Sequence, residues 1–394
     1  MELRKLTASD YDELLEVLNS VFTRENKKPM DFLNLLPKMW VRDDQHMGYH
    51  TGIFEDGKLV SVAGCYPLPA KIAGIPFLFA TTGNVATLPE YEGRGYFTTI
   101  FTELMKELEQ MDVDAARLNG ARQRYARYGY EPAGSVYQVV FTENNRLKYF
   151  HDAGSDLVFK EIERSDLESL AFCDTLSRKS DFYVDRSTEE DYRDVYLALR
   201  GKHATPYLAV KKNLPVGYLV AVDDKQMSGH ARNGRHIYEL RYNCLENFIE
   251  MVCAWQRKVD DEITFRLAPY MTEEMELISP CAEYITVSSP SHFKIRDYER
   301  LADALLKLKA SKESLLNGEV ILGIKDYGTI KLFVSKDNQG CIKTEEKPEL
   351  ILDQLSATRM LFGHVPYYTA GLTANPLWKN WLPLPFSWNI MDSV

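Results

Sequence analysis

The chain has no apolar stretch long enough to cross a lipid bilayer, and no apolar signal core follows its first residues. A membrane-spanning helix needs about 20 consecutive apolar residues, and a secretion signal carries an apolar core behind a short basic segment. The start, Met1-Glu2-Leu3-Arg4-Lys5, is followed by no such core. These absences exclude a helical membrane protein and predict a cytoplasmic protein with no membrane partner.

Cysteine is sparse, and its positions form no metal-binding pattern. There is no Cys-x-x-Cys pair and no histidine spacing that suits zinc. The sequence therefore predicts free thiols in a reducing compartment and no metal site. The six cysteines are Cys65, Cys173, Cys244, Cys253, Cys281 and Cys341.

Positive charge is also in deficit, because 47 Lys and Arg residues oppose 57 Asp and Glu residues and give a formal net charge of −10. A nucleic-acid-binding surface needs a basic excess, so no nucleic-acid partner is predicted. The negative charge favours a cationic substrate. The 394 residues, 45% apolar and 26% charged, predict a soluble protein of two or three domains.

The most informative stretch present runs from Asn84 to Leu104. It begins as a strand, is interrupted at Leu88-Pro89, passes through Gly93-Arg94-Gly95 and continues with apolar residues at helical spacing. A helix start offers unpaired N–H groups and partial positive charge, and glycines let the backbone approach a ligand. With Arg94 beside it, this turn is expected to hold a diphosphate.

This pattern resembles the pyrophosphate loop of the GNAT N-acetyltransferases. That loop has a valine in the strand, then a proline, an aromatic residue and two glycines separated by one residue. The matching residues here are Val85, Pro89, Tyr91, Gly93, Arg94 and Gly95. Two positions depart from the family pattern. Glu92 stands where arginine or glutamine is usual, and Phe97 stands where a small residue is usual.

A second stretch, Gly120 to Pro132, resembles the tyrosine-containing segment that closes the acetyl-CoA site in the same enzymes. In that family a phenol near the thioester sulfur protonates the leaving thiolate, which is general acid catalysis. Tyr125 takes this place by motif, whereas Tyr128 and Tyr130 are interpreted as packing residues around Gly129.

The resemblance also implies which residues hold acetyl-CoA. The strand amides would bind the pantetheine arm and polarise the acetyl carbonyl, the glycine turn would bind the pyrophosphate, and the next strand would flank the cosubstrate. In that order these residues are Val85, Ala86 and Thr87, then Gly93, Arg94, Gly95, Tyr96, Phe97 and Thr98, and then Asn119, Gly120 and Ala121.

The pattern of elements predicts a mixed α+β chain of three parts. Residues 1–150 are expected to form a GNAT domain that includes a helix over Met30 to Trp40 and ends with a strand over Val136 to Phe141. Residues 151–290 repeat its strands and helix without a comparable glycine turn, as a degenerate GNAT-like domain. Residues 291–394 resemble a sterol-carrier-like domain, with a three-strand meander and a helix from Pro348 to about Leu361.

The C-terminus is unusually apolar, with three of the five tryptophans in residues 378–394, and we expect it to be buried. A chain of these three domains that ends in an apolar tail resembles the enhanced-intracellular-survival (Eis) type acetyltransferases. In that family the terminal carboxylate enters the first domain's active site as the general base. Here that group is the α-carboxylate of Val394, with Asp392 as the alternative.

Two functions from different classes follow. The first is an acetyl-CoA-dependent N-acetyltransferase that acts directly, without a cysteine intermediate, on a small cationic amine such as an aminoglycoside or a polyamine. A lipid or wall precursor is a further acceptor that the sequence leaves open. The second is an acetyl-CoA- or lipid-binding assembly protein with a vestigial site, because Glu92 would repel a diphosphate. The resemblance implies a homo-oligomer, either a trimer or a hexamer.

Overall fold

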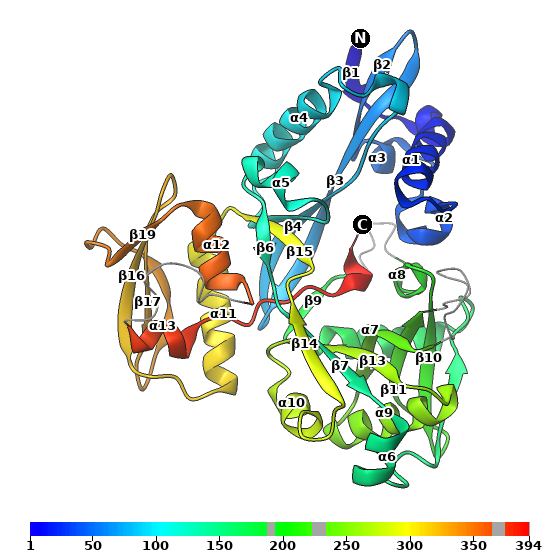
Figure 1. Ribbon diagram of the computed structural model, residues 1–394, viewed down its shortest axis with the longest axis vertical. Coiled ribbons are helices and arrows are strands. Elements are labelled where there is room, and N and C mark those ends of the chain that lie inside the picture. Colours follow the sequence, from blue (N-terminus) through cyan, green and yellow to red (C-terminus); the bar gives the residue numbers. More distant parts are fainter. Residues whose placement is uncertain (187–193, 223–233, 365–374, 394) are drawn as a thin grey trace.

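The computed structural model describes residues 1–186, 194–222, 234–364 and 375–393. Within these residues the chain builds three β-sheets, each covered by its own helices (Figure 1). We call each sheet with its helices the first, second and third unit. The mixed α+β class predicted from the sequence is confirmed.

The first sheet is antiparallel except where β4 and β5 run parallel at its centre. Its strand order is β1-β2-β3-β4-β5-β15-β6, with β9 paired to β3. Neighbouring residues of β3 point to opposite faces, so Leu59 packs under α1 and Val60 under α4. The strands are β1 (Glu2–Lys5), β2 (His50–Glu55), β3 (Lys58–Ile72), β4 (Ile75–Thr87), β5 (Ala115–Leu118), β6 (Glu131–Ala133), β9 (Phe182–Val184) and β15 (Ser291–Ile295). The helices are α1 (Tyr11–Asn26), α2 (Phe32–Leu35), α3 (Asp44–Met47), α4 (Tyr96–Gln110) and α5 (Arg122–Tyr125).

The second sheet repeats this plan, with the order β14-β7-β13-β12-β11-β10-β8 and one parallel pair, β12 with β13. Helix α7 covers one face and α9 the other. The strands are β7 (Val136–Phe141), β8 (Leu157–Glu161), β10 (Ala204–Lys211), β11 (Leu214–Val222), β12 (His236–Tyr242), β13 (Ile263–Leu267) and β14 (Tyr284–Ser288). The helices are α6 (Glu143–Tyr149), α7 (Leu167–Arg178), α8 (Val195–Arg200), α9 (Leu245–Val259) and α10 (Thr272–Ile278).

The two large sheets exchange one strand each. Strand β7 follows β6 of the first sheet but lies between β13 and β14 of the second, and β15 follows β14 of the second sheet but lies between β5 and β6 of the first. The prediction that 136–141 is the last strand of the first domain is therefore wrong. Val139 and Phe141 are buried in the second unit's core, and that burial fixes the strand there. The boundaries at 150 and 290 stay predictions.

The third sheet is a meander with a fourth strand parallel to its first, in the order β18-β17-β16-β19. The expected helix from Pro348 is wrong at its start. Residues 350–352 pair with β16 instead, and the helix begins after Asp353, whose side chain accepts a hydrogen bond from the amide of Ser356 at 2.9 Å. The elements are α11 (Tyr298–Lys312), β16 (Gly318–Ile324), β17 (Gly328–Val334), β18 (Gln339–Lys343), β19 (Leu350–Leu352), α12 (Gln354–Phe362) and α13 (Pro376–Trp381).

The predicted helix over Met30 to Trp40 is also wrong, because Pro37 divides it. Helix α2 ends at Leu35, and residues Pro37–Met39 form a separate 3-10 helix. Proline lacks the N–H that would continue an α-helix and disfavours helical geometry in the residue before it. The broken segment lies between α1 and α8 (Figure 1).

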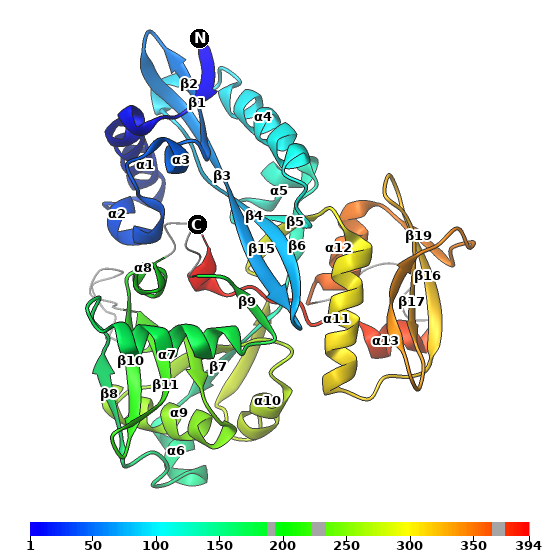
Figure 2. The same cartoon turned by 180° about the vertical axis from the view of Figure 1, so that it is seen from behind.

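The C-terminal tail runs from the third unit between the two larger ones, as both views show (Figures 1 and 2). Trp381 and Phe386 are fully buried, and the Phe386 ring packs 4.7 Å from the ring of Phe293 in β15. The tail ends in a 3-10 helix, Ile390–Asp392, beside α8. The expected burial of the apolar tail is confirmed. Among the described helices, none is long and apolar enough to cross a membrane.

Candidate active site

The first unit opens where strands β4 and β5 separate. Their parallel pairing runs from Phe79 with Ala115 to Thr82 with Leu118 and stops there. Strand β4 continues beside β3 alone, and the backbone after β5 turns away into α5. A cavity of about 450 Å³ lies at this opening. The predicted residues that line it are Val85, Asn119, Gly120, Ala121 and Tyr125.

A bulge in β4 shapes the floor of this cavity. Asn84 has a φ of +55°, and the pairing with β3 shifts around it. Its buried side-chain amide donates to the Tyr66 hydroxyl at 2.5 Å, and that hydroxyl lies 2.6 Å from His50 Nε2. Burial lowers the His50 pKa to about 3, so this network is neutral. Asn84 was not predicted as a site residue, although Gly83-Asn84 inside a strand pattern is a known bulge signal.

The predicted pyrophosphate turn has the geometry of an anion cradle. Gly93 and Gly95 have φ values of +77° and +83°, and a Cβ at either position would meet nothing within 4 Å. The amide of Thr99 donates to the carbonyl of Gly95 at 3.0 Å, so the helix leaves the preceding amides free for a ligand. A cavity of about 340 Å³ lies against this turn. Its lining residues are Thr87, Tyr91, Glu92, Gly93, Gly95, Tyr96 and Phe97.

Three predicted cosubstrate residues have side chains outside both linings. The Arg94 guanidinium pairs with Glu55 at 3.2 Å and lies 4.7 Å from the centre of the Tyr91 ring. Thr98 is exposed on α4, and Ala86 is buried against the α1 face of the sheet. The Ala86 backbone is engaged with β3, where it pairs with Val62 and its carbonyl accepts from the Ser61 hydroxyl at 3.1 Å.

The Glu92 carboxylate in this turn has a cationic partner. Arg24 Nη1, at the end of α1, lies 2.9 Å from Glu92 Oε1. Both side chains are more than half exposed, at 59% and 56%, so the pair adds little to stability. It nevertheless brings a second cation to the turn and offsets the charge that Glu92 places there. Arg24 was missed because the contact joins elements far apart in sequence.

Tyr125 lies on the wall of the larger cavity. Its ring is 5% exposed and packs 6.0 Å from Phe97 and 5.2 Å from Phe101, between ring centres. A Cβ on Gly120 would lie 2.4 Å from Tyr125 Cε2, so this ring position requires glycine there. Burial raises the Tyr125 pKa, which keeps the phenol protonated and able to donate.

Among the described residues, the second unit contributes Lys202 to this cavity. Lys202 lines it and follows α8, and Lys202 and His203 both have positive φ, +60° and +59°. Two adjacent left-handed residues without glycine are uncommon and strained. The Lys202 amide donates to the carbonyl of Leu35 in α2 at 2.7 Å, which holds the turn against the first unit. No sequence signal pointed to this lysine.

The tail ends beside the same wall. Lys38 Nζ, just after α2, donates to the carbonyl of Met391 at 2.6 Å. Asp392 accepts from Arg186 at 2.7 and 3.1 Å, and Arg186 also pairs with Glu239 at 2.7 Å. Asp392 is thus held in a buried ion pair and is a poor candidate for the base. Val394 lies outside the described residues.

Buried cations surround the end of the tail. Burial is the main cause that lowers the pKa of Lys38 to about 7, of Lys202 to about 8 and of Arg117 to about 9. The Asp392 carboxylate, which opposes this effect at Lys38 and Arg117, is already paired with Arg186. A further carboxylate would be stabilised here. Within the described residues no cluster of histidine, cysteine or carboxylate side chains is arranged to hold a metal ion.

Comparison with known families identifies the first unit. Residues 2–133 match the family described as acetyltransferase (GNAT) domain. These residues form a GNAT acetyltransferase domain. The splayed strands, the glycine cradle and Tyr125 all lie in this GNAT domain, whose fold implies acetyl-CoA binding. No curated protein gives a significant match.

Solved structures share the fold over nearly the whole chain. A GCN5-related N-acetyltransferase from Anabaena variabilis has a TM-score of 0.61 and 17% identity, covering 91% of this chain and 89% of its own. Eis1 from Mycobacterium abscessus has a TM-score of 0.60 and 16% identity, with the same two coverages. A probable N-acyltransferase from Enterococcus faecalis has a TM-score of 0.61 and 14% identity, covering 91% and 88%. These likenesses show a shared fold, and the match of residues 2–133 to the GNAT acetyltransferase domain indicates an acetyl-CoA-dependent N-acetyltransferase.

Proposed function

We propose that the protein transfers an acetyl group from acetyl-CoA directly to a primary amine of a small acceptor, as in the Eis-type enzymes. The observation that carries this proposal is the arrangement at the end of β4. The strand opening, the glycine cradle and the Tyr125 ring adjoin one another along one side of the first sheet. This is the set of parts that thioester binding and acyl transfer require.

The residues present fit acetyl-CoA, because the cradle is open and its glycines adopt backbone conformations that other residues rarely adopt. The amides from Gly93 to Thr98 would hold the pyrophosphate. The backbone of Val85, Ala86 and Thr87 would hold the pantetheine arm, flanked by Asn119, Gly120 and Ala121. When bound, acetyl-CoA supplies an acetyl group activated as a thioester.

Tyr125 acts as the general acid in this proposal. Its raised pKa keeps the proton on the phenol oxygen at neutral pH, and the ring packing fixes the hydroxyl at the cavity wall. A positioned phenol can then donate that proton to the departing sulfur. The buried ring also keeps water away from one side of the cavity.

The Val394 carboxylate acts as the general base. Ser393, the preceding residue, is fully buried, and Met391 is hydrogen-bonded to Lys38 next to the acceptor side of the cavity. Lys38, Lys202 and Arg117 favour a carboxylate at this place by charge. An acceptor ammonium must lose a proton before it attacks, and a carboxylate can take it directly or through water.

No cysteine is among the described lining residues, which supports direct transfer. For the acceptor we propose a small cationic amine, aminoglycoside-like or polyamine-like. Glu25 is the carboxylate among the described lining residues that would attract such a cation. Arg124 and Lys202 line the same cavity and work against a polycation. The acceptor panel below therefore includes amines with and without an acidic group. A cytoplasmic homo-oligomer, a trimer or a hexamer, completes the proposal.

The alternative, a binding protein with a vestigial site, rests on Glu92. That argument is weaker in the folded protein, because Arg24 pairs with the Glu92 carboxylate. The two functions separate on acetyl-CoA binding and turnover.

Acetyl-CoA titration by thermal shift, followed by free-thiol release with polyamines, aminoglycosides and amino acids, tests the proposal. Acetyl-CoA should raise the melting temperature by mass action. A matched pair of variants locates the binding. Gly95→Val should abolish the shift, whereas Gly74→Val, with a similar φ of +81° and equally open space in a distant turn, should retain it. A shift without thiol release from any amine would favour the vestigial site, and no shift would refute the proposed function.

A further inference from the structure

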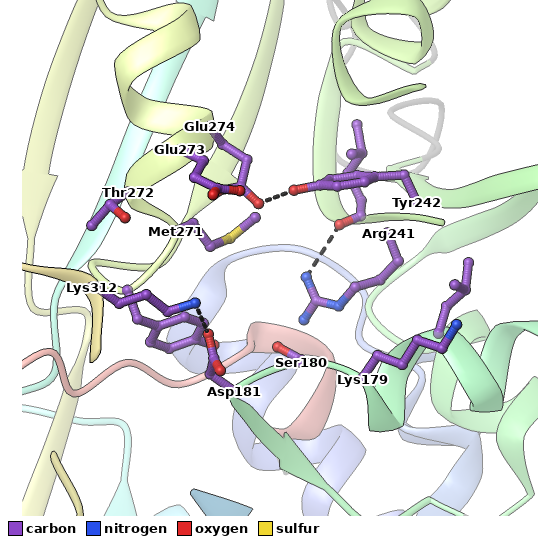
Figure 3. Close-up of a pocket in the computed structure, with 13 residues that line it drawn as sticks. Lys179, Ser180, Asp181, Arg241, Tyr242, Met271, Thr272, Glu273, Glu274 and Lys312 are labelled. Carbon is purple, nitrogen blue, oxygen red and sulfur yellow. Dashed lines mark hydrogen bonds and ion pairs between the residues drawn. The ribbon is translucent and has the colours of Figure 1, made fainter. Parts of the chain in front are cut away.

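The second sheet repeats the strand separation that forms the acetyl-CoA opening of the first. Strands β12 and β13 pair only at His236 with Thr264 and Ile237 with Phe265, and then diverge. Helices α7 and α10 are the counterparts, in the second unit, of α1 and α5 in the first. A cavity of about 210 Å³ lies at the divergence, between the ends of α7 and β12 and the start of α10 (Figure 3). The second unit has therefore kept a pocket at the equivalent position.

This pocket has no phosphate cradle. Only Asn243 and Cys244 connect β12 to α9, whereas residues 88–95 connect β4 to α4 in the first unit. The short connection contains no glycine, and the cavity has less than half the volume of its counterpart, 210 against 450 Å³. A molecule the size of acetyl-CoA is excluded, so the pocket is suited to a small ligand.

Arg241, near the end of β12, points its guanidinium into this cavity (Figure 3). Nη1 donates to the carbonyl of Leu240 at 3.1 Å, and the buried Nε has no hydrogen-bond partner in the described part of the chain. Glu239, on the same side of the strand, raises the pKa of Arg241 by its charge. Its hydrogen bonds, however, come from Arg186 at 2.7 and 2.9 Å and from Tyr218. Buried N–H donors in proteins normally have a hydrogen-bond partner, so the unpartnered Nε of Arg241 needs an explanation.

The other polar groups of the cavity are mostly paired with one another. Tyr242 donates to Glu274, and Lys312 lies 2.9 Å from Asp181 across the opening. Figure 3 shows both pairs at the sides of the cavity, with the Arg241 guanidinium between them. Two described cations of the lining, Arg241 and Lys179, are left without an ion pair there, and Arg241 has the buried donor without a partner.

We propose that this cavity binds a small organic carboxylate, with Arg241 as its anion-binding residue. A guanidinium presents two parallel N–H groups that match the two oxygens of a carboxylate, and such charge-assisted bonds are stronger than neutral ones. The site is built mainly from the second unit, with Lys312 of α11 in its lining, and it stands independently of the acetyl-transfer proposal. It makes the second unit a ligand-binding domain instead of a purely structural one.

Isothermal titration of the full chain with sodium succinate, sodium glutamate and inorganic phosphate tests this site. The carboxylates should bind the wild-type protein and Arg266→Gln, and should bind Arg241→Gln at least about tenfold more weakly. Arg266 is a matched control because it lies on the adjacent β13, 4.9 Å from the ring centre of Tyr238, outside the cavity lining. A second variant, Ser180→Leu, places a larger side chain in the cavity lining and keeps Arg241. It should also abolish carboxylate binding.

Circular dichroism and the melting temperature of each variant show whether it is folded. If Arg241→Gln does not fold, Ser180→Leu alone decides the question. Carboxylate binding by folded Arg241→Gln or folded Ser180→Leu that equals binding by the wild-type protein would overturn the proposal. So would binding of phosphate in place of carboxylates, or no binding of any of the three probes.

Discussion

Tyr125 reaches the cavity wall because residue 120 has no side chain. The space that a Cβ would need at Gly120 is taken by the tyrosine ring, and Phe97 and Phe101 fix the ring from the other side. Phe97, which departs from the small residue usual in the family pattern, thereby becomes part of the support for the tyrosine. One loop glycine and two residues of α4 act together to position one hydroxyl.

Tyr125→Phe should lower kcat by about 100-fold or more, because general acid catalysis contributes about 10²–10⁴-fold, while the melting shift with acetyl-CoA is retained. Tyr128→Phe is the matched control, since its ring packs on Phe101 from the same segment and should leave kcat unchanged. Steady-state kinetics by thiol release measures both variants. Parallel loss of turnover and acetyl-CoA binding in Tyr125→Phe would instead assign the tyrosine a structural role.

Lys38 predicts a pH dependence of stability. Burial lowers its pKa from the ordinary 10.5 to about 7, so between these values the unfolded chain binds more protons than the folded one. The free energy of unfolding of the wild type should therefore rise relative to that of Lys38→Met from about pH 7 to 10.5, and stay level below pH 7. Urea unfolding across this range measures the difference. Parallel profiles for the two proteins would contradict the assignment.

At the scale of elements, the sequence predicted best what is built locally. Helix α4 and the turn before it follow from glycines, an apolar spacing and a proline that are contiguous in sequence, and Gly93 and Gly95 adopt left-handed φ values in that turn. That the turn holds a pyrophosphate stays a prediction. The error at residues 350–352 has the opposite cause. Proline at the start of a helical pattern was a valid local signal, but pairing with β16 prevailed over it.

Contacts between distant segments were beyond prediction from one sequence. Nothing in the residues around Lys202 marks it as a part of the first unit's cavity, and the placement of β15 depends on pairing with strands more than 150 residues earlier. Arg24 is a similar case, since its partner Glu92 comes from another element. The missed site residues are those that reach the site through tertiary contacts.

The 3-10 helix at the end of the tail is held by a buried ion network. Arg186→Met would leave the carboxylates of Asp392 and Glu239 buried without their cation, and should cost about 3–5 kcal/mol of stability. Arg178→Met is the control, because its pairs with Asp174 and Asp185 are partly exposed and are expected to contribute about 0–1 kcal/mol. Urea unfolding measures the stability of both variants. Equal losses of stability would show that the buried network contributes no more than the partly exposed ion pairs.

At the scale of the whole molecule, the candidate site is assembled by all three units. The first unit supplies the cradle and Tyr125, the second supplies Lys202, and the third leads into the tail that ends between them (Figures 1 and 2). Such a site depends on the relative placement of the units as much as on any single residue.

Two residues added after Val394, such as Gly-Ser, should abolish turnover while the fold and the acetyl-CoA melting shift remain. The extension would replace the proposed base, the Val394 carboxylate, by a carboxylate two residues further along the chain. Ser393, the residue before Val394, is fully buried. Thiol release and thermal shift measure the two effects, with the same Gly-Ser added before Met1 as the control. Full activity of the C-terminally extended protein would remove the carboxylate from the mechanism.

The exchange of β7 and β15 has a consequence for how the chain emerges from the ribosome. Strand β6 ends at Ala133, but the place beside it stays vacant until Ser291–Ile295 has been synthesised. During that interval the strand that pairs with both β5 and β6 is missing. Strand β7 likewise has no pairing partner until β13 and β14 have been synthesised. Neither large sheet can close before the other is nearly complete, so the nascent chain exposes unpaired strand edges for much of its synthesis.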